Sequence, residues 1–258
     1  MTTVLAVANQ KGGVGKTTTC VNVAAALAAE NRRVLLVDMD PQGNATMGSG
    51  VDKHDLESST CDVLLGEATV AEARVRAGES GFDLLPANSD LTAAEVTLME
   101  SQGRERRLSE VLAPLVDEYD FVLIDCPPSL NMLTVNALVA ADGVVVPVQC
   151  EYYALEGLSA LMSTIRQISE SVNPKLRVAG LLRTMFDPRN NLANEVSAQL
   201  VLHFGDKVFR TVVPRNVRLA EAPSHGVPVI HYDRNSRGSM AYQGLAGEIM
   251  RREHRSAA

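Results

Sequence analysis

The segment Lys11–Thr18, with the sequence KGGVGKTT, constrains the fold of this chain more than any other part of it. It follows the apolar run 4–8, which is expected to be a strand, and it opens the segment 16–29, which is expected to be a helix. Its three glycines allow backbone N–H groups to turn toward phosphate oxygens with no Cβ in the way. The helix N-terminus adds a partial positive charge. The pattern therefore predicts a phosphate-binding loop.

The residues of this loop have separate expected roles. Lys16 is expected to reach the β- and γ-phosphates of a nucleotide, and the Thr17 hydroxyl is expected to be a ligand of Mg²⁺. The loop departs from the usual G-x-x-x-x-G-K-[ST] pattern, because Gln10 stands at the first glycine position and a second lysine, Lys11, follows it. The other expected nucleotide contacts are Gly12, Gly13, Val14, Gly15 and Thr18.

Aspartates stand where two further apolar runs end. Asp38 and Asp40 lie in LLVDMDPQGN, and Asp125 lies in FVLIDCPPS. Ligands of open α/β sheets bind beyond the carboxyl ends of the strands, so these carboxylates are expected to face the nucleotide. An apolar strand ending in aspartate is also the Walker B pattern, which predicts that Asp125 belongs to the Mg²⁺ shell, directly or through water.

The rest of the chain alternates between short apolar runs and longer helical patterns. Apolar runs without alternation indicate strands covered on both faces, as in a parallel sheet. We therefore expect an α/β fold, a single-domain P-loop NTPase over residues 1–258 with a mostly parallel twisted sheet flanked by helices on both faces. The expected strands are 4–8, 33–37, 82–85, 121–124, 143–148, 177–182 and 208–212. The expected helices are 16–29, 90–100, 106–115, 130–140, 155–170, 191–203 and 239–252.

The motif KGGVGKTT together with DMDPQGN closely resembles the deviant Walker A ATPases of the ParA/MinD family. The resemblance implies that Lys11 reaches across a dimer interface to the ATP of the partner subunit, so that ATP binding produces a homodimer. It also implies that Asp40 positions or activates the attacking water, and that Asp38 supports the shell of Mg²⁺ and Lys16. The expected catalytic residues are therefore Lys11, Lys16 and Asp40.

A later segment, Val213–Gly226, resembles the chromosomal ParA (Soj-like) branch of that family. The resemblance implies that Pro214 and Asn216 contact the adenine, and that Arg189 binds DNA. We expect Arg189, Arg215 and Arg218 to contact DNA phosphates, because a guanidinium pairs with phosphate through two hydrogen bonds.

Charge distribution agrees with a basic surface on an acidic protein. The net charge is −7 overall, but it is −13 over residues 1–172 and +6 over residues 173–258. No base-reading motif is evident in the sequence. The absence of tryptophan and an aromatic content of 4% disfavour a stacking platform for single strands. The expected partner is double-stranded DNA, bound without sequence preference and sensitive to salt.

The family resemblance also implies a timed switch. ATP and Mg²⁺ close the dimer on DNA, and hydrolysis, stimulated by a ParB-like centromere-binding protein, releases it. Scattered cysteines and the lack of a signal peptide or a membrane-length apolar run predict a cytoplasmic protein with no membrane partner. The resemblance implies that this protein is associated with the nucleoid.

Three other interpretations share the phosphate motifs. A MinD-like division-site regulator requires an amphipathic C-terminal helix for the membrane surface, whereas few bulky apolar residues follow Met250. An iron–sulfur relative needs paired cysteines, and the chain has no C-x-x-C. An orphan ParA-like protein that positions other cargo would carry the same motifs, and chromosome and plasmid origins are equally open.

Overall fold

The computed structural model of the chain describes residues 2–115 and 117–257. All of its strands join one eight-stranded sheet in the order β3-β4-β2-β5-β1-β6-β7-β8. Neighbouring strands are parallel except β3 and β4, which are antiparallel. The strands are β1 (Thr3–Val7), β2 (Val34–Asp38), β3 (Val75–Arg76), β4 (Asp83–Leu85), β5 (Phe121–Asp125), β6 (Gly143–Gln149), β7 (Arg177–Phe186) and β8 (Val208–Pro214).

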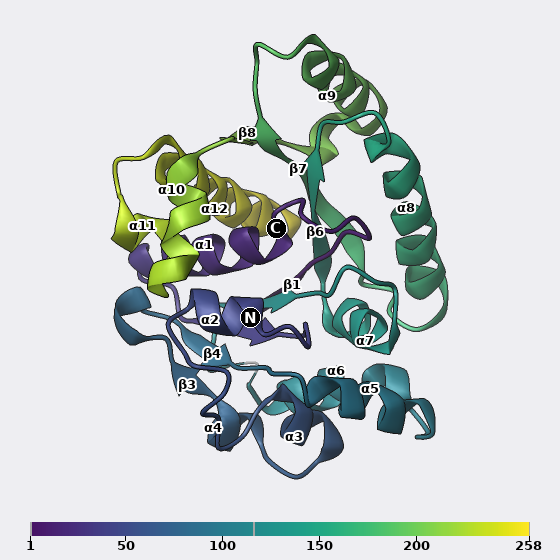
Figure 1. Cartoon of the computed structure of the whole chain (residues 1–258). Coiled ribbons are helices and arrows are strands. Elements are labelled where there is room, and N and C mark those ends of the chain that lie inside the picture. The colour runs from purple at the N-terminus through teal and green to yellow at the C-terminus, as the bar shows by residue number, and fades with distance from the viewer. Residues whose placement is uncertain (1, 116, 258) are drawn as a thin grey trace.

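Helices cover both faces of this sheet (Figure 1). One face carries α1 (Lys16–Ala29), α11 (Val229–Tyr232) and α12 (Arg237–Ala257), with α2 (Asn44–Gly48) and α10 (Val217–Glu221) beside them. The other face carries α3 (Thr60–Leu65), α4 (Val70–Ala73), α5 (Leu91–Met99), α6 (Arg107–Leu112), α7 (Met132–Ala140), α8 (Ala154–Ser171) and α9 (Asn191–Phe204). The expected fold class, a mostly parallel sheet between two helical layers, is confirmed.

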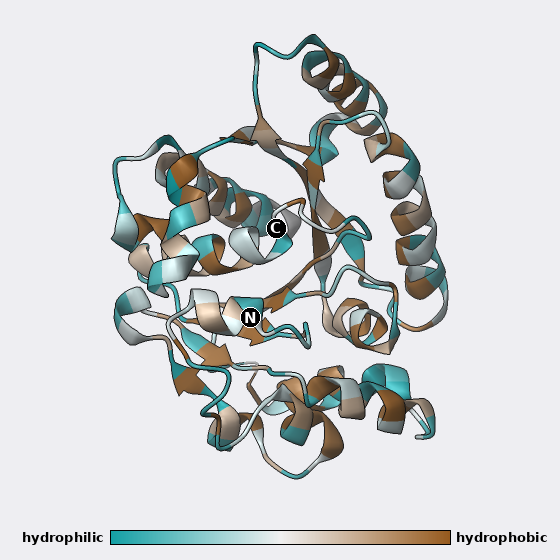
Figure 2. Ribbon diagram, viewed as in Figure 1, coloured by the Kyte–Doolittle hydropathy of each residue, from teal (hydrophilic) through white to brown (hydrophobic). Residues whose placement is uncertain are grey.

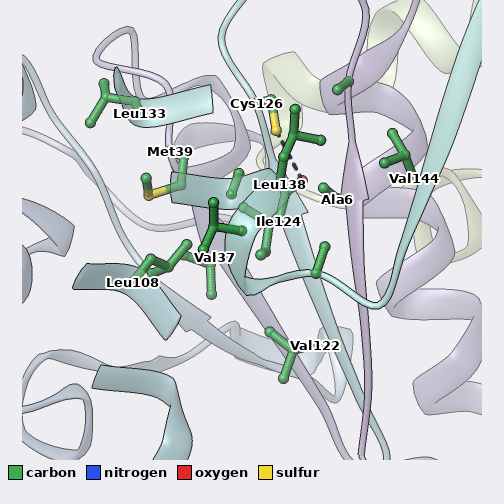
Figure 3. Packing of buried hydrophobic residues seen from close by; sticks show 14 of the residues in the cluster. Ala6, Val37, Met39, Leu108, Val122, Ile124, Cys126, Leu133, Leu138 and Val144 are labelled. Carbon is green, nitrogen blue, oxygen red and sulfur yellow. Dashed lines mark hydrogen bonds between the residues drawn. The ribbon is translucent and has the colours of Figure 1, made fainter. Parts of the chain in front are cut away.

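Alternate residues of the central strands fill two separate cores. In β1, Leu5 packs in the core beneath α1 and α12, whereas Ala6 packs in the core beneath α7. The same alternation holds in β5, where Leu123 and Ile124 face opposite sides. Burial of both faces explains the uninterrupted apolar runs of the sequence, which Figure 2 shows as brown central strands. Figure 3 shows the second core, with Ile124 and neighbouring strand residues beside Leu138 of α7.

Elements with a long apolar pattern lie where the sequence predicted them. The expected helix 16–29 coincides with α1, and the other six expected helices and seven expected strands differ from the observed elements by a few residues at their ends. The short elements of residues 44–76, namely α2, α3, α4 and β3, were not predicted, and neither was the short helix α11. The expected helix 106–115 is α6 followed by a 3₁₀ turn over Ala113–Leu115.

The parallel register places the carboxyl ends of several strands side by side. Val7 of β1 pairs with Asp125 of β5, and Asp38 of β2 pairs with that same Asp125. Loops that follow β1, β2 and β5 therefore meet at one edge of the sheet, beside the N-terminus of α1. This meeting point positions the candidate site.

A close contact between β7 and β8 gives a test of the packing. A methyl group at Gly180 would lie 2.4 Å from the ring of Phe209, which is 1% exposed and has no room to move. We expect Gly180→Ala to lower the free energy of unfolding by about 1–3 kcal/mol, the usual cost of overpacking, as measured by urea denaturation. The matched control is Gly157→Ala in α8, where nothing lies within 4 Å, and a loss of stability there equal to that of Gly180→Ala would contradict the prediction.

Among the described residues, no helix combines the length and the apolar character that crossing a membrane requires.

Candidate functional site

The glycine-rich loop after β1 has the backbone shape that phosphate binding needs. Gly13 and Gly15 have φ angles of 72° and 89°, in the left-handed region that L side chains rarely adopt. Gly15 is the N-cap of α1, which begins at Lys16. The Thr184 hydroxyl of β7 donates to the Val14 carbonyl at 2.8 Å and ties the loop to the sheet. The loop is therefore held over the N-terminus of α1, where backbone N–H groups and the helix dipole favour an anion.

The two lysines of the loop point to different places. Lys16 is 7% exposed, and its Nζ lies 3.4 Å from the carbonyl of Lys11. The Lys11 side chain is 43% exposed and pairs with Glu151, which follows β6. Lys16 thus stays over its own loop, whereas Lys11 extends along the surface away from it.

A cavity of about 660 Å³ opens beside the loop. This volume lies within the usual 300–1,000 Å³ range of small-molecule sites. The predicted residues that line it are Gly12, Gly13, Gly15, Lys16, Thr17, Thr18 and Asp40. Val14, which is 1% exposed, and Lys11 lie outside that lining.

Asp38, at the end of β2, is completely buried and well supplied with hydrogen bonds. Its Oδ2 accepts from the Thr46 N–H at 2.9 Å and from the Thr46 hydroxyl at 2.7 Å, and its Oδ1 accepts from the Asp40 N–H at 3.1 Å. Burial raises the pKa of Asp38 by more than these hydrogen bonds lower it, so this pKa lies above its ordinary value. In this arrangement Asp38 holds the start of α2 and the backbone of Asp40 in place.

Asp125, at the end of β5, is also buried but has an incomplete set of partners. The Cys20 thiol donates to its Oδ1 at 3.5 Å, whereas Oδ2 has no hydrogen-bond partner in the protein. Burial and then the charge of Asp38 raise its pKa, while the nearby Thr17 hydroxyl lowers it. A buried oxygen without a hydrogen-bond partner destabilises the folded protein. Asp125 could therefore bind a cation, or a water molecule coordinated to a cation, through this oxygen.

Asp40 is placed at the wall of the cavity. Its Oδ1 accepts from the Gln42 N–H at 3.0 Å, and no described residue donates to its other oxygen. The side chain is 8% exposed. One carboxylate oxygen therefore remains for a ligand or a water in the cavity.

The oxygen donors near the loop suit a hard divalent cation. Thr17 supplies a hydroxyl and Asp125 a free carboxylate oxygen, and Mg²⁺ prefers oxygen ligands, with water and phosphate oxygens making up the rest. Within residues 2–115 and 117–257, no group of three or more His, Cys, Asp or Glu side chains is arranged to hold a metal by itself. The site fits a cation that arrives with a nucleotide better than a cage built wholly by the protein.

Of the three predicted DNA-binding arginines, Arg189 follows β7, Arg215 follows β8 and Arg218 lies in α10. Arg189 is 88% exposed and makes two hydrogen bonds with Asp187, at 3.0 and 2.8 Å. These bonds lower the pKa of Asp187 to about 2, and the charge of Arg215 contributes. Arg218 pairs with Glu221 at 2.8 Å and with Asp233 at 3.3 Å. Tertiary structure thus brings Arg189 beside Arg215, although 25 residues separate them in the sequence.

Pro214 is the last residue of β8, and Asn216 is the N-cap of α10. Neither residue lines the 660 Å³ cavity. The Oδ1 of Asn216 is buried and has no hydrogen-bond partner. It lies against Gly238 at the start of α12, where an added Cβ would come within 3.1 Å of it.

Some of the cavity lining was not predicted from the sequence. Met185 lies in the cavity wall with a φ of 48°, an uncommon backbone conformation for a residue other than glycine. The other unpredicted residues are Val21, Asn22, Gln42, Asn44, Met47, Gly48, Pro128, Ala222, Pro223, Ser224 and Val227. A signal existed for only part of this set, because Gln42, Asn44, Pro128 and Ala222–Ser224 belong to segments already singled out.

A strand, a glycine-rich loop with a buried lysine, and three aspartates at strand ends define a P-loop nucleotide-binding protein. Comparison with known proteins agrees, since an AAA domain model matches residues 2–178. The chain is 51% identical to the chromosome partitioning protein ParA of Caulobacter vibrioides over 252 residues, which are 97% of this chain and 94% of that protein. It is also 51% identical to the sporulation initiation inhibitor protein Soj of Bacillus subtilis over 246 residues, which are 95% and 97% of the two chains. The chain belongs to the ParA/Soj family of chromosome-partitioning P-loop ATPases.

A solved structure extends the likeness to the fold. The protein described as cobyrinic acid a,c-diamide synthase from Mycobacterium smegmatis, crystallised with an ATP analogue and magnesium, superposes with a TM-score of 0.86 at 41% identity. The match covers 97% of this chain and 95% of that one.

Proposed function

We propose that this protein is an ATP-driven partition switch that closes into a dimer on ATP and Mg²⁺, binds duplex DNA without sequence preference, and leaves the DNA after hydrolysis. The observation that carries the proposal is the pair of lysines in one loop. Lys16 is buried over its own phosphate site, while Lys11 projects from the surface.

The residues around the cavity support ATP and Mg²⁺ as its ligands. Thr17 and Asp125 would hold Mg²⁺, which lowers the charge of the phosphates and polarises them. Lys16 and the N–H groups of Gly12–Gly15 would bind the phosphates, and Asp40 would orient the attacking water through its free oxygen. The unpartnered oxygen of Asn216 would accept from the adenine amine, with Pro214 beside it. The ATP analogue and magnesium of the M. smegmatis structure support this assignment.

Lys11 supports a dimer as the ATP-bound form. Its pair with Glu151 is half exposed on both sides. Exposed pairs of this kind contribute about 0–1 kcal/mol, so the phosphates of a second subunit's ATP would compete with Glu151 easily. The lysine side chain is therefore available to a partner subunit at little cost.

The arginine group of Arg189, Arg215 and Arg218 supports DNA as the partner. Arg189 pairs with Asp187, and Arg218 pairs with Glu221 and Asp233, at the protein surface. DNA phosphates would replace these carboxylates at a similarly small cost in free energy. Duplication of the group in a dimer would give about six phosphate contacts.

The names of the relatives support the remaining parts of the proposal. ParA of C. vibrioides is a chromosome partitioning protein, which favours a ParB-like stimulating partner over a MinD-like membrane role. The protein would then act in the cytoplasm, on the nucleoid. We also propose that residues 1–258 act as a single domain, because one sheet joins strands from both halves of the chain.

The test is binding to a random-sequence duplex, with ATP and Mg²⁺ or with ADP, over a salt series. We expect binding only with ATP, with a slope of log K against log salt of about −5, as roughly six phosphate contacts would give. Replacing Arg189, Arg215 or Arg218 by alanine should each make that slope less negative by about 2, because the dimer loses two phosphate contacts.

The control is Arg76→Ala, which removes an exposed arginine paired with Asp83 at the opposite end of the sheet. It should leave the slope unchanged. Equal binding with ATP and ADP, or no binding, would remove DNA from the proposal while leaving the ATPase assignment intact.

A further inference from the structure

A second cavity lies at the other end of β7 and β8, away from the nucleotide site. It measures about 750 Å³. Its walls are residues 177–183 of β7, the first half of β8, the end of α9 with the 3₁₀ turn Gly205–Lys207, and the second half of α12. It shares no lining residue with the 660 Å³ cavity beside the P-loop. We call it the β8-edge cavity, since β8 is the last strand of the sheet (Figure 1).

The β8-edge cavity is strongly basic in a protein whose net charge is −7. Two acidic residues, Asp206 and Glu248, belong to its wall. The basic residues of the wall are Arg177, Arg183, Lys207, Arg210, Arg251 and Arg252. Positive charges therefore outnumber negative ones by four in this small volume.

The carboxylate of Glu248 does not neutralise most of this charge. It accepts from the Arg210 N–H at 2.9 Å, from the Thr211 N–H at 3.0 Å and from the Thr211 hydroxyl at 2.9 Å. Its one ion pair is with Arg252, at 2.8 Å. Glu248 thus accepts hydrogen bonds from the backbone N–H groups at the outer edge of β8 and forms an ion pair with Arg252.

Most of the other cations have no carboxylate partner. Arg177 pairs with Glu253. Among the described residues, no acidic group lies within ion-pair distance of the remaining four cations, which are Arg183, Lys207, Arg210 and Arg251. The cavity therefore holds uncompensated positive charge.

Arg183 is the most informative of these four. It is half-buried, and its guanidinium donates only to neutral oxygens, the Ser197 hydroxyl at 3.1 Å and the carbonyls of Phe209 at 2.8 Å and Arg210 at 3.3 Å. Its Nε is buried with no hydrogen-bond partner. Burial lowers the pKa of Arg183. The carboxylate of Glu248 acts on this guanidinium from beyond ion-pair distance. Burying a charge without a paired counter-charge is unfavourable, and an anion in the cavity would supply that pair.

We propose that the β8-edge cavity binds a small molecule carrying two or more phosphate groups, at a site separate from the ATP site. Guanidinium groups pair with phosphate through two parallel hydrogen bonds, and four uncompensated cations match a polyphosphate better than a single carboxylate. The volume is close to that of the cavity beside the P-loop and within the range of small-ligand sites. A concave pocket of this size suits a compact ligand, whereas a DNA duplex is a convex rod that needs an open surface.

The proposal is tested by calorimetric titration of inorganic tripolyphosphate into the full chain at about 0.15 M salt. The protein carries Lys16→Ala, so that the P-loop contributes little binding. We expect one tripolyphosphate per chain, and slower amide hydrogen exchange in β7 and β8 when it is bound. Adding Arg183→Gln should weaken this binding at least 10-fold.

Arg183 also supports β8, so two further variants separate binding from folding. Lys207→Gln and Arg251→Gln change exposed side chains that make no hydrogen bond or ion pair with any described residue. Together they should weaken tripolyphosphate binding at least 10-fold at an unchanged melting temperature. Arg76→Gln, at the opposite end of the sheet, should have no effect.

Two results would overturn the proposal. One is the absence of tripolyphosphate binding in the Lys16→Ala background, or binding that the cavity variants leave unchanged. The other is a protein with Lys207 and Arg251 intact that binds duplex DNA but no tripolyphosphate, and that loses DNA affinity when both residues are replaced by glutamine, which would assign the cavity to a DNA surface.

Discussion

Replacing Asp40 by alanine is expected to reduce ATP hydrolysis by at least about 100-fold while ATP still binds. Asp40 lines the cavity beside the P-loop, and only one of its carboxylate oxygens is used, by the Gln42 N–H. The other oxygen is free to orient or deprotonate a water. Positioned acid–base groups contribute typically 10²–10⁴-fold to a rate. Lys16 and the loop glycines, which would bind the phosphates, are unchanged in this variant. Phosphate release and the affinity for a fluorescent ATP analogue measure the two effects.

The same variant should prolong the DNA-bound state. If hydrolysis ends the DNA-bound dimer, Asp40→Ala protein with ATP should stay on a duplex after dilution, whereas the native protein should leave it. Asp52→Ala is a matched control, since it removes an exposed aspartate near α2 whose carboxylate accepts from the His54 N–H. Hydrolysis at the native rate in the Asp40→Ala protein would show that another group activates the water.

Replacing Lys11 by alanine should abolish the ATP-dependent dimer with little change in ATP affinity. The Lys11 side chain leaves its own cavity, so its loss should alter ATP binding by less than about threefold. A lysine that reaches the partner's phosphates is partly desolvated there, and charge-assisted hydrogen bonds of that kind contribute about 1.5–3 kcal/mol each. Two of them in a symmetric dimer correspond to a loss of at least about 100-fold in dimer affinity. Light scattering with a non-hydrolysable ATP analogue measures this.

Glu151→Gln separates the two roles that Lys11 has in the proposal. It removes the intramolecular pair of Lys11 and leaves the lysine free. If Lys11 acts across the interface, Glu151→Gln protein should dimerise at least as well as the native protein. An ATP-dependent dimer in the Lys11→Ala protein would remove the cross-subunit role, and the loss of dimers in Glu151→Gln protein would point to a structural role for the pair.

Sequence patterns succeeded where a physical requirement is local. The segment 16–29 is helical because a glycine in the left-handed conformation precedes it and small and apolar residues fill the buried face. The expected strands 121–124 and 33–37 were recognisable because the residues that β5 and β2 bury on both faces are apolar up to the aspartate that ends each strand. The short elements between residues 44 and 76 escaped prediction. Helices such as α3 and α4 are only four to six residues long and depend on capping boxes at Ser59 and Thr69.

The sequence motifs predicted the positions of the three aspartates but not their hydrogen-bond partners. The sequence placed Asp38, Asp40 and Asp125 at strand ends near one another, and the register of β2 and β5 agrees with that. It could not distinguish their environments. Asp38 is saturated by Thr46 and the Asp40 backbone, whereas Asp125 keeps an unpartnered oxygen. That difference depends on which side chains of α1 and α2 pack against each carboxylate.

The sequence by itself determined the class of the site. Phosphate binding needs glycines and a lysine at fixed spacing along one strand, loop and helix, and all of these are local in the chain. Only the tertiary structure decided the rest of the cavity beside the P-loop and the β8-edge cavity. Met185 of β7 and Ala222–Ser224 of the 3₁₀ turn after α10 line the cavity beside the P-loop, and that turn packs on α2. Arg183, Lys207 and Arg251 line one cavity because β7, β8 and α12 pack together. Such contacts join residues tens to hundreds of positions apart, and no local pattern encodes them.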